Sequence, residues 1–213
     1  MTLALAVDTT NEHGSIAIAD DEIGVREETP VHAPEGFSRV LFGEIQSLLA
    51  RQNLSLEQID IYAGASGPGS FTGVRVGLTA MKGLAEVNGK KVVAVSNLAA
   101  LAALGKTNTR AVIIDAKRGE IFAAVYNAEG IEIIKEQVLP LKTFLTLLPL
   151  GPIEWISEGL GMYAPAGSEI YEAPKEIAGA IARIALCSEP KDPAAIEANY
   201  VRRSDAEIFW KEA

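Results

Sequence analysis

Hydrophobic residues in the first half of this chain fall into two kinds of pattern. Short apolar runs bordered by Asp, Asn, Gly and Pro have the length and the borders of β-strands. They predict strands at residues 3–7, 15–19, 23–29, 59–63 and 91–95. Hydrophobic residues spaced three and four positions apart predict helices over residues 35–52 and 73–87. Ser96 is a candidate cap for a third, shorter helix over residues 97–104.

The second half repeats part of this order. Strands are predicted at residues 111–114, 121–126, 131–139 and 153–157, and an amphipathic helix at residues 175–186. Each half opens with a strand that ends in Asp, followed by a turn containing Gly and a second strand, so Asp8 and Asp115 are equivalent. The repeat predicts an α/β fold of two closely joined lobes, residues 1–106 and 107–213, because no linker long enough to separate independent domains is present. We expect the charged tail from residue 199 to pack back on the N-terminal lobe or to fray.

Composition narrows the classes of function. The 213 residues are 48% hydrophobic and 22% charged, as in globular proteins, and the net charge is −9. An acidic chain is poorly suited to hold a phosphate backbone alone, so a partner is expected to supply most of any RNA contact. The single cysteine, Cys187, excludes a disulfide framework and is expected to be buried. No apolar run approaches about 18 residues, which predicts a cytoplasmic protein without membrane association.

No constellation for covalent chemistry can be assembled from these residues. His13 and His32 both lie in predicted turns or loops, without the spacing of metal ligands on a helix. No nucleophile elbow accompanies them, and Cys187 has no histidine nearby in the sequence. We therefore expect no catalytic residue, no metal site and no enzymatic activity of the chain by itself.

The two equivalent turns leave two interpretations open. In an actin-like or ribonuclease-H-like fold such turns can hold a metal-bound nucleotide, here through Asp8, Asp115 and the hydroxyls of Thr9, Thr10 and Ser15. Alternatively, each Asp only makes a local hydrogen bond within its turn. The first turn lacks the extra glycine that lets a backbone close around a phosphate, so a nucleotide site there would be vestigial.

A glycine-rich stretch, SGPGSFTGVRVG at residues 66–77, joins a strand to the second helix. Ser70 or Thr72 can cap that helix, and the segment is either a plain turn or an anion site at a helix N-terminus. Its spacing matches neither a P-loop nor the dinucleotide fingerprint. The helices over residues 35–52 and 73–87 are apolar around much of their circumference. Either both are buried in one core, or they cover the sheet on one side and meet another polypeptide on the other.

At residues 67–77 the sequence GPGSFTGVRVG closely resembles the signature of the TsaB family, formerly YeaZ, of tRNA threonylcarbamoyladenosine biosynthesis proteins. Three further segments agree in order: AVDTT at residues 6–10, SNL at 96–98 and IDAKRGEI at 114–121. The stretch from Pro193 through YVRRSDAE at 200–207 resembles the closing pattern of the family with an altered spacer. The resemblance spans nearly the whole chain, although residues 143–188 match loosely and Phe37 stands where many members have His.

The resemblance implies an actin-like ATPase-type (ASKHA) fold of two ribonuclease-H-like lobes with mixed sheets. It implies a non-catalytic partner of the catalytic subunit TsaD, which holds the metal and transfers threonylcarbamoyl to an adenosine beside the tRNA anticodon. An ATPase subunit, TsaE, would join them, with tRNA bound through the complex. ATP or ADP would bind, if at all, at the subunit junction, so no cofactor is expected in this chain.

Family members pair through the first two long helices, with TsaD or with a second copy when TsaD is absent. The expected interface residues are Phe37, Leu41, Ile45, Gly73, Gly77, Ala80, Met81 and Leu84. Two other hypotheses stay open. One is an actin-fold enzyme that binds or hydrolyses nucleotides with Asp8, Thr9, Thr10 and Asp115. The other is a peptidase, for which the histidine pair of a metal centre is missing.

Overall fold

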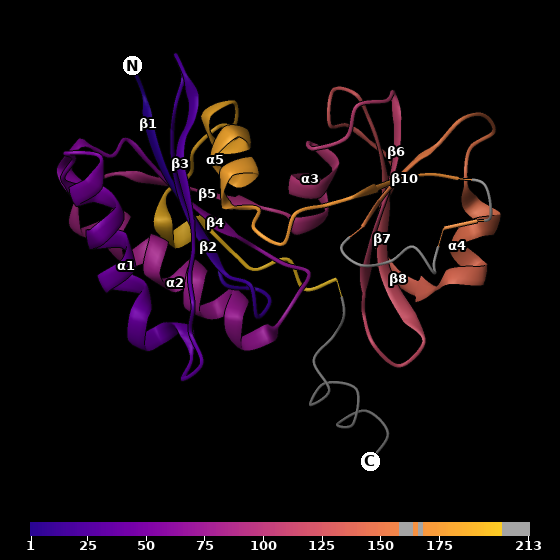
Figure 1. The fold of residues 1–213 in the computed structure, drawn as a ribbon, viewed down its shortest axis with the longest axis horizontal. Coiled ribbons are helices and arrows are strands. Elements are labelled where there is room, and N and C mark those ends of the chain that lie inside the picture. Colours follow the sequence, from indigo (N-terminus) through magenta and orange to yellow (C-terminus); the bar gives the residue numbers. More distant parts are fainter. Residues whose placement is uncertain (158–163, 166–167, 202–213) are drawn as a thin grey trace. The chain divides into compact units, whose positions relative to one another are not determined.

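The computed structural model describes residues 1–157, 164–165 and 168–201 and divides the chain into two compact units (Figure 1). The first unit consists of Met1–Ala100 and Pro174–Ala198. The second contains Leu101–Ala173 and resumes at Asn199. The expected boundary at residue 106 is therefore displaced. The helix predicted at residues 175–186, which the sequence assigned to the C-terminal lobe, belongs to the first unit.

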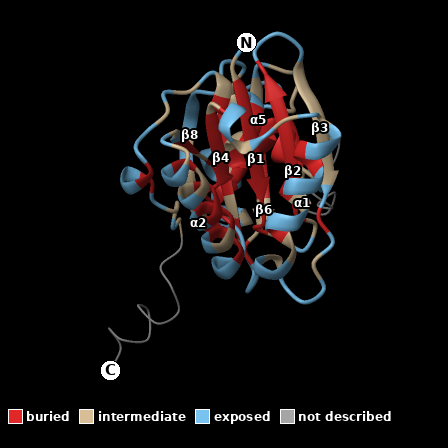
Figure 2. Ribbon diagram, turned by 90° about the vertical axis from the view of Figure 1, so that its left-hand side faces the viewer, coloured by how far each residue is buried: buried red, intermediate tan, exposed pale blue. Residues whose placement is uncertain are grey.

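A five-stranded mixed sheet forms the centre of the first unit. Its strands are β1 (Leu3–Asp8), β2 (Ser15–Asp20), β3 (Gly24–Pro30), β4 (Ile61–Ala65) and β5 (Lys91–Val95), in the order β3-β2-β1-β4-β5. Strands β1, β2 and β3 pair antiparallel, whereas β4 lies parallel to both β1 and β5. Figure 2 shows buried positions concentrated on β1, β2 and β4. All five predicted strands of this half are confirmed, with boundaries shifted by a few residues.

Helices cover both faces of this sheet. Helices α1 (Phe37–Arg51) and α2 (Phe71–Val87) lie on one side of the strands and α5 (Ala178–Leu186) on the other (Figure 1), while the short α3 (Asn97–Ala102) follows β5. Side chains alternate between the faces of a strand. Along β1 the large residues Leu3, Leu5 and Val7 join the core beneath α1 and α2. The alanines between them lie on the other face, where small side chains allow α5 to approach closely.

The first unit also supplies the cap of α5. The helix has no side-chain cap of its own. Instead, the N–H of Ala178 donates to Ser15 Oγ at 3.0 Å, and the N–H of Gly179 donates to Glu28 Oε1 at 3.0 Å. These bonds satisfy N–H groups that a helix start leaves unpaired. At the other end of α5, Cys187 is exposed, so its predicted burial is wrong.

The second unit repeats the topology of the first. Its strands are β6 (Thr109–Asp115), β7 (Glu120–Asn127), β8 (Glu132–Pro140), β9 (Glu154–Ser157) and β10 (Glu169–Glu172), in the order β10-β9-β6-β7-β8. As in the first sheet, the central strand pairs antiparallel on one side and parallel on the other. Strands β6, β7 and β8 pair antiparallel, and β6, β9 and β10 pair parallel. Phe144 of α4 (Leu141–Leu147) packs edge-on against Trp155 of β9, with ring centroids 6.3 Å apart. The internal repeat predicted from the sequence is thus confirmed as two sheets of the same strand order.

Short connections complete both units. One-turn helices lie at Leu56–Gln58 and Pro193–Ala195. At the start of the tail, Asn199 Nδ2 donates to Glu136 Oε2 of β8 at 2.5 Å, which is a contact inside the second unit rather than with the N-terminal lobe. The remainder of the tail, residues 202–213, lies outside the described residues. In the part of the chain that the structure describes, none of the helices combines the length and apolar character needed to cross a membrane.

Candidate functional site

The turn after β1 places Asp8 in the interior of the first unit. Its Oδ1 accepts hydrogen bonds from the N–H of Thr10 at 2.8 Å and from Thr10 Oγ1 at 2.6 Å. Among the described residues, Asp8 Oδ2 is buried without a hydrogen-bond partner. Complete burial raises the pKa of Asp8 above its ordinary value, and the charge of Glu28 acts in the same direction, while the hydrogen bonds from Thr10 and the nearby amide of Asn97 oppose the rise.

The hydroxyls expected to hold a nucleotide are bonded within the protein. Thr9 Oγ1 donates to the carbonyl of Gly73 at 2.7 Å, and Thr10 Oγ1 donates to Asp8. The N–H of Ser70 donates to the carbonyl of Thr10 at 2.7 Å. The two threonines are 1% and 3% exposed. The turn therefore has the local hydrogen bond given as the alternative interpretation, and its polar groups are directed into the protein.

The glycines of the signature segment let α2 begin directly on this turn. A Cβ on Gly73 would lie 1.9 Å from the carbonyl oxygen of Thr9, and one on Gly77 would lie 2.6 Å from Thr9 Oγ1. Ser70 Oγ accepts from the N–H of Gly73 at 3.2 Å, so the predicted cap is confirmed. Assigning Gly73 and Gly77 to an outward interface is wrong, because their missing side chains make room for the β1–β2 turn.

Asn97, which the sequence did not single out as a site residue, joins three segments of this region. Its Nδ2 donates to Thr10 Oγ1 at 2.6 Å, and its Oδ1 accepts from the N–H of Gly67 at 3.0 Å. The N–H of Asn97 donates in turn to the carbonyl of Gly67 at 2.9 Å. We call Asp8, Thr9, Thr10 and Asn97 the buried polar cluster. The sequence contained one indication of its importance, because Asn97 lies in the SNL segment at residues 96–98 that resembles the family. That segment does not reveal which residues Asn97 contacts.

Asp115 occupies the matching position of the second unit, at the end of β6. Its carboxylate accepts from the N–H of Lys117 at 2.7 Å and from Lys117 Nζ at 2.9 Å, and the side chain is 34% exposed. The hydrogen bonds from Lys117 lower the pKa of Asp115. Its carboxylate therefore shapes its own turn, as the alternative interpretation predicted.

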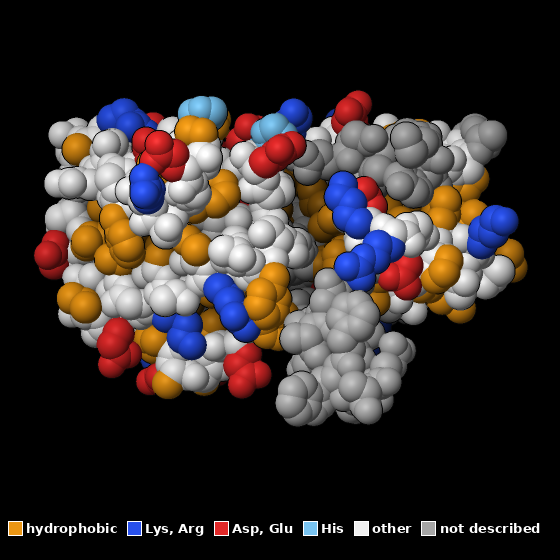
Figure 3. Space-filling view, turned by 90° about the horizontal axis from the view of Figure 1, so that it is seen from below, with side chains coloured by type: hydrophobic (Ala, Val, Ile, Leu, Met, Phe, Trp, Pro, Cys, Tyr) orange, Lys and Arg blue, Asp and Glu red, His pale blue; other side chains and the backbone are white. Residues whose placement is uncertain are grey.

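An apolar groove lies between α1 and α2 on the surface of the first unit. Its volume is about 620 Å³. The residues that line it are Ser38, Leu41, Phe42, Arg75, Val76, Thr79, Ala80, Gly83, Leu84 and Val87. The guanidinium carbon of Arg75 lies 3.8 Å from the centre of the Phe71 ring, which is 42% exposed. Figure 3 shows hydrophobic side chains, in orange, exposed among white polar side chains and backbone on the surface of this unit.

The groove contains some of the residues expected at an interface and excludes others. Leu41, Ala80 and Leu84 line it. Ile45 and Met81 do not line it and are at most 2% exposed in the core against the sheet, where Leu41 is buried as deeply although it also lines the groove. The most apolar stripe of each helix packs against the sheet. The exposed apolar surface of the groove is therefore formed mainly by residues at neighbouring positions on the two helices.

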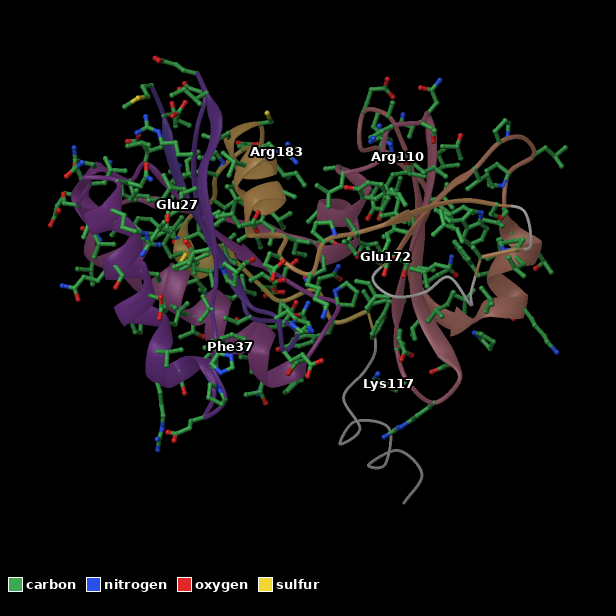
Figure 4. The ribbon with its side chains drawn as sticks, in the orientation of Figure 1. Glu27, Phe37, Arg110, Lys117, Glu172 and Arg183 are labelled. Carbon is green, nitrogen blue, oxygen red and sulfur yellow. The ribbon has the colours of Figure 1, made fainter. Side chains whose placement is uncertain are left out.

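Two groove residues that the sequence missed are Phe42, 55% exposed on α1, and Val87, 86% exposed at the end of α2. Phe37, which was expected at the interface, is half-buried against the core beside Gly14 (Figure 4). Each helix therefore has a buried stripe against the sheet and an exposed apolar stripe, so the two helices are not buried entirely in one core.

No group of three or more His, Cys, Asp or Glu side chains within the described part of the chain is arranged to hold a metal ion.

Comparisons with other proteins agree with this architecture. A family model described as TsaD, tRNA N6-adenosine threonylcarbamoyltransferase, matches residues 17–159. The tRNA threonylcarbamoyladenosine biosynthesis protein TsaB of Bacillus subtilis is 27% identical over 98% of this chain and 98% of its own length. TsaB of Escherichia coli K12 is 32% identical over 75% of this chain and 72% of its own.

The solved structure of YeaZ from Pseudomonas aeruginosa has the same fold, with a TM-score of 0.80. The two are 24% identical, and the alignment covers 94% of this chain and all of that one. The predicted class, an actin-like fold of two ribonuclease-H-like lobes with mixed sheets, is confirmed. Because these relatives match this chain over most of its length, the chain belongs to the TsaB (YeaZ) family of tRNA threonylcarbamoyladenosine biosynthesis proteins.

Proposed function

We propose that this chain is a non-catalytic subunit in the synthesis of threonylcarbamoyladenosine in tRNA, and that it binds and activates a TsaD-family transferase through the α1–α2 groove. The groove itself is the observation that carries this proposal. It offers a continuous apolar surface with an exposed aromatic residue, Phe42, and with Arg75 stacked on Phe71 at one end. Aromatic residues and arginine are enriched where protein interfaces gain most of their binding energy.

The sequence similarity of this chain to the TsaD family supports a TsaD-family transferase as the partner that binds the groove. The residues matched by the TsaD family model, 17–159, include both α1 and α2. A TsaD-family protein therefore has a related lobe with counterparts of these helices. Two related lobes can pair through equivalent helix faces about an approximate two-fold axis. The same geometry allows a homodimer of this chain, which would compete with the transferase for the groove.

The buried polar cluster supports the absence of catalysis. An actin-fold hydrolase directs an aspartate and hydroxyls towards its nucleotide, whereas here Asp8, Thr9 and Thr10 are buried and bonded to protein groups. In this proposal ATP or ADP binds only at the junction with the transferase. The ATPase subunit TsaE and the tRNA join through the complex, in the cytoplasm.

The test of the groove uses two substitutions at exposed positions, Phe42→Asp and Val87→Asp. A buried, unpaired carboxylate at an interface should weaken binding to a TsaD-family transferase by about 30-fold or more. Titration calorimetry and size-exclusion chromatography would measure the loss. The control is Ile23→Asp, which places the same charge on a residue that is 75% exposed in the β2–β3 turn, outside the groove. Unchanged affinity of both groove variants would refute the assignment.

Catalysis is tested separately by incubating the purified chain with labelled ATP and magnesium. We expect no turnover by the chain alone, and threonylcarbamoyl transfer only when the transferase is added. Turnover by the chain alone that disappears in Asp8→Asn would instead support the nucleotide-hydrolysing enzyme.

A further inference from the structure

Helix α2 contains three glycines, and packing within the first unit accounts for two of them, Gly73 and Gly77, which make room for the β1–β2 turn. Gly83 differs. It is exposed, and apart from the adjoining helix backbone no atom of the described residues lies within 4 Å of the position that its Cβ would occupy. Glycine in the interior of a helix is less favourable than alanine, because it loses more backbone entropy on folding. The unit by itself therefore gains nothing from glycine at position 83.

Gly83 lies in the middle of an apolar stripe along α2. The stripe consists of residues at steps of four, three and four positions that all line the groove: Val76, Ala80, Gly83 and Val87. This spacing places them on one face of the helix, over a length of about 16 Å. It is also the spacing with which a second helix packs alongside at a small crossing angle. The stripe therefore suits an elongated partner such as a helix.

The stripe is deepest at its centre. Its outer members are valines, and Val87 is 86% exposed, whereas its inner members have a single methyl group or no side chain. On the opposite side of the groove, α1 contributes the exposed ring of Phe42. The cores of protein interfaces are packed as densely as protein interiors. A partner that covers this surface must therefore fill the space over Gly83 with a side chain of its own.

We propose that a large apolar side chain from a helix of the transferase inserts over Gly83, and that the glycine sets how closely that helix approaches α2. The distance between two packed helices depends on the side chains at their contact, and glycine permits the shortest distance. The match to the TsaD family model includes α2, so a transferase of that family has a counterpart helix to place there. The identity of the partner rests on the proposed function, whereas the depth of the stripe follows from α2 itself.

The experiment compares Gly83→Ala with the unaltered full chain. The melting temperature of the chain alone should rise by about 1–4 °C, because the methyl group enters open space and alanine favours the helix. Titration calorimetry with a TsaD-family transferase should show affinity falling by about 10-fold, because the same methyl group occupies the space of the inserted side chain. Gly83→Leu should lower the affinity by about 100-fold. A purely structural role for Gly83 predicts instead that stability and affinity fall together.

The matched control is Gly43→Ala. Gly43 is also an exposed glycine inside a helix, with no atom of the described part of the chain within 4 Å of its Cβ position, but it does not line the groove. This variant should show a similar rise in melting temperature and an unchanged affinity. An equal loss of affinity in the control, or an unchanged affinity of Gly83→Ala, would overturn the proposal.

Two further outcomes separate this inference from the assignment of the groove. If Phe42→Asp and Val87→Asp weaken binding while Gly83→Ala and Gly83→Leu do not, the groove is still the interface and only the insertion over Gly83 is wrong. If all four variants bind normally, the proposed function fails as well. Analytical ultracentrifugation examines a second copy of this chain as the occupant. Loss of a homodimer in Gly83→Ala with unchanged affinity for the transferase would overturn the proposal in favour of that second copy.

Discussion

Asp8 and Asp115 end equivalent strands of two sheets with the same order, and each accepts a hydrogen bond from the N–H two residues later. Their surroundings are opposite. Asp8 is completely buried and its pKa is raised, whereas Asp115 is partly exposed beside Lys117 and its pKa is lowered. The local pattern of a strand, an Asp and a turn therefore fixes the shape of the turn. Whether that turn is interior or exposed depends on what packs against it.

In the first unit the packing partner is α2. Its glycines bring the first turn of the helix against the backbone of Thr9 and Thr10. In the second unit the corresponding turn presents Lys117 and Arg118 to solvent. One copy of the repeated element is thus part of a core, while the other lies at the surface of its unit. Substitutions can enlarge or remove this difference.

The largest effect is expected for Gly73→Ala. The added Cβ would lie 1.9 Å from a backbone oxygen, so the helix must move away from the turn, at a cost of about 3 kcal/mol or more in the free energy of unfolding. Gly43→Ala is the control, because Gly43 is an exposed helical glycine of α1 with no atom within 4 Å of its Cβ position. That change should stabilise by about 0.5–1 kcal/mol. Equal denaturation midpoints for Gly73→Ala and the wild type would show that the contact is not tight.

An intermediate effect is expected for Asn97→Ala. Removing the amide leaves the buried N–H of Gly67 without its acceptor and Thr10 Oγ1 without a donor, which should cost about 2–3 kcal/mol. Asn127→Ala is the counterpart in the second unit. Asn127 Oδ1 accepts from the N–H groups of Glu129 and Ile131, and because this β7–β8 turn is exposed the cost should be at most about 1 kcal/mol. Urea denaturation of the two variants gives both values, and a reversed order would contradict the contrast between the units.

The smallest effects concern pH, and they should have opposite signs. A carboxyl whose pKa is raised by folding favours the neutral form, so the stability it contributes is present below the ordinary pKa of 3.8 and is lost as pH rises through the raised pKa. Asp8→Asn should remove this loss. Asp115 contributes stability above pH 3.8 that is lost as pH falls through its lowered pKa, and Asp115→Asn should remove that gain. Denaturation between about pH 3 and pH 8 tests both, and pH profiles that shift in the same direction would disprove the comparison.

Most of the fold follows from local patterns. Strands of the first half and the helices over Phe37–Arg51 and Phe71–Val87 were predicted because period and turn residues are properties of the segment itself. Among the described residues, the elements that were missed, apart from the two one-turn helices, are α4 (Leu141–Leu147) and β10 (Glu169–Glu172). Both are short, and β10 lies in a stretch rich in Gly and Pro, which masks the alternation on which strand prediction depends.

The candidate site was less predictable than the fold. The sequence indicated that α1 and α2 are too apolar for a single contact, but it could not say which stripe faces the sheet. As a result Ile45 and Met81 were assigned to an interface, although they are core residues, while Phe42 and Val87 were overlooked. The role of Asn97 depends on its contacts with Gly67 and Thr10, which lie 30 and 87 positions away in the sequence. No local pattern contains that information.

Helix α5 carries a consequence for how the protein is made. A ribosome releases Met1–Ala100 first, yet this portion lacks the layer that covers one face of its sheet until Ala178–Leu186 has emerged. During that interval the alanine-lined face of β1 and β4 and the acceptor Ser15 Oγ stay uncovered, since their helix is still untranslated. The sheet encoded first is therefore covered only after the last strand of the second sheet, β10, has been translated, and a nascent chain arrested before residue 178 would expose apolar surface to chaperones and proteases.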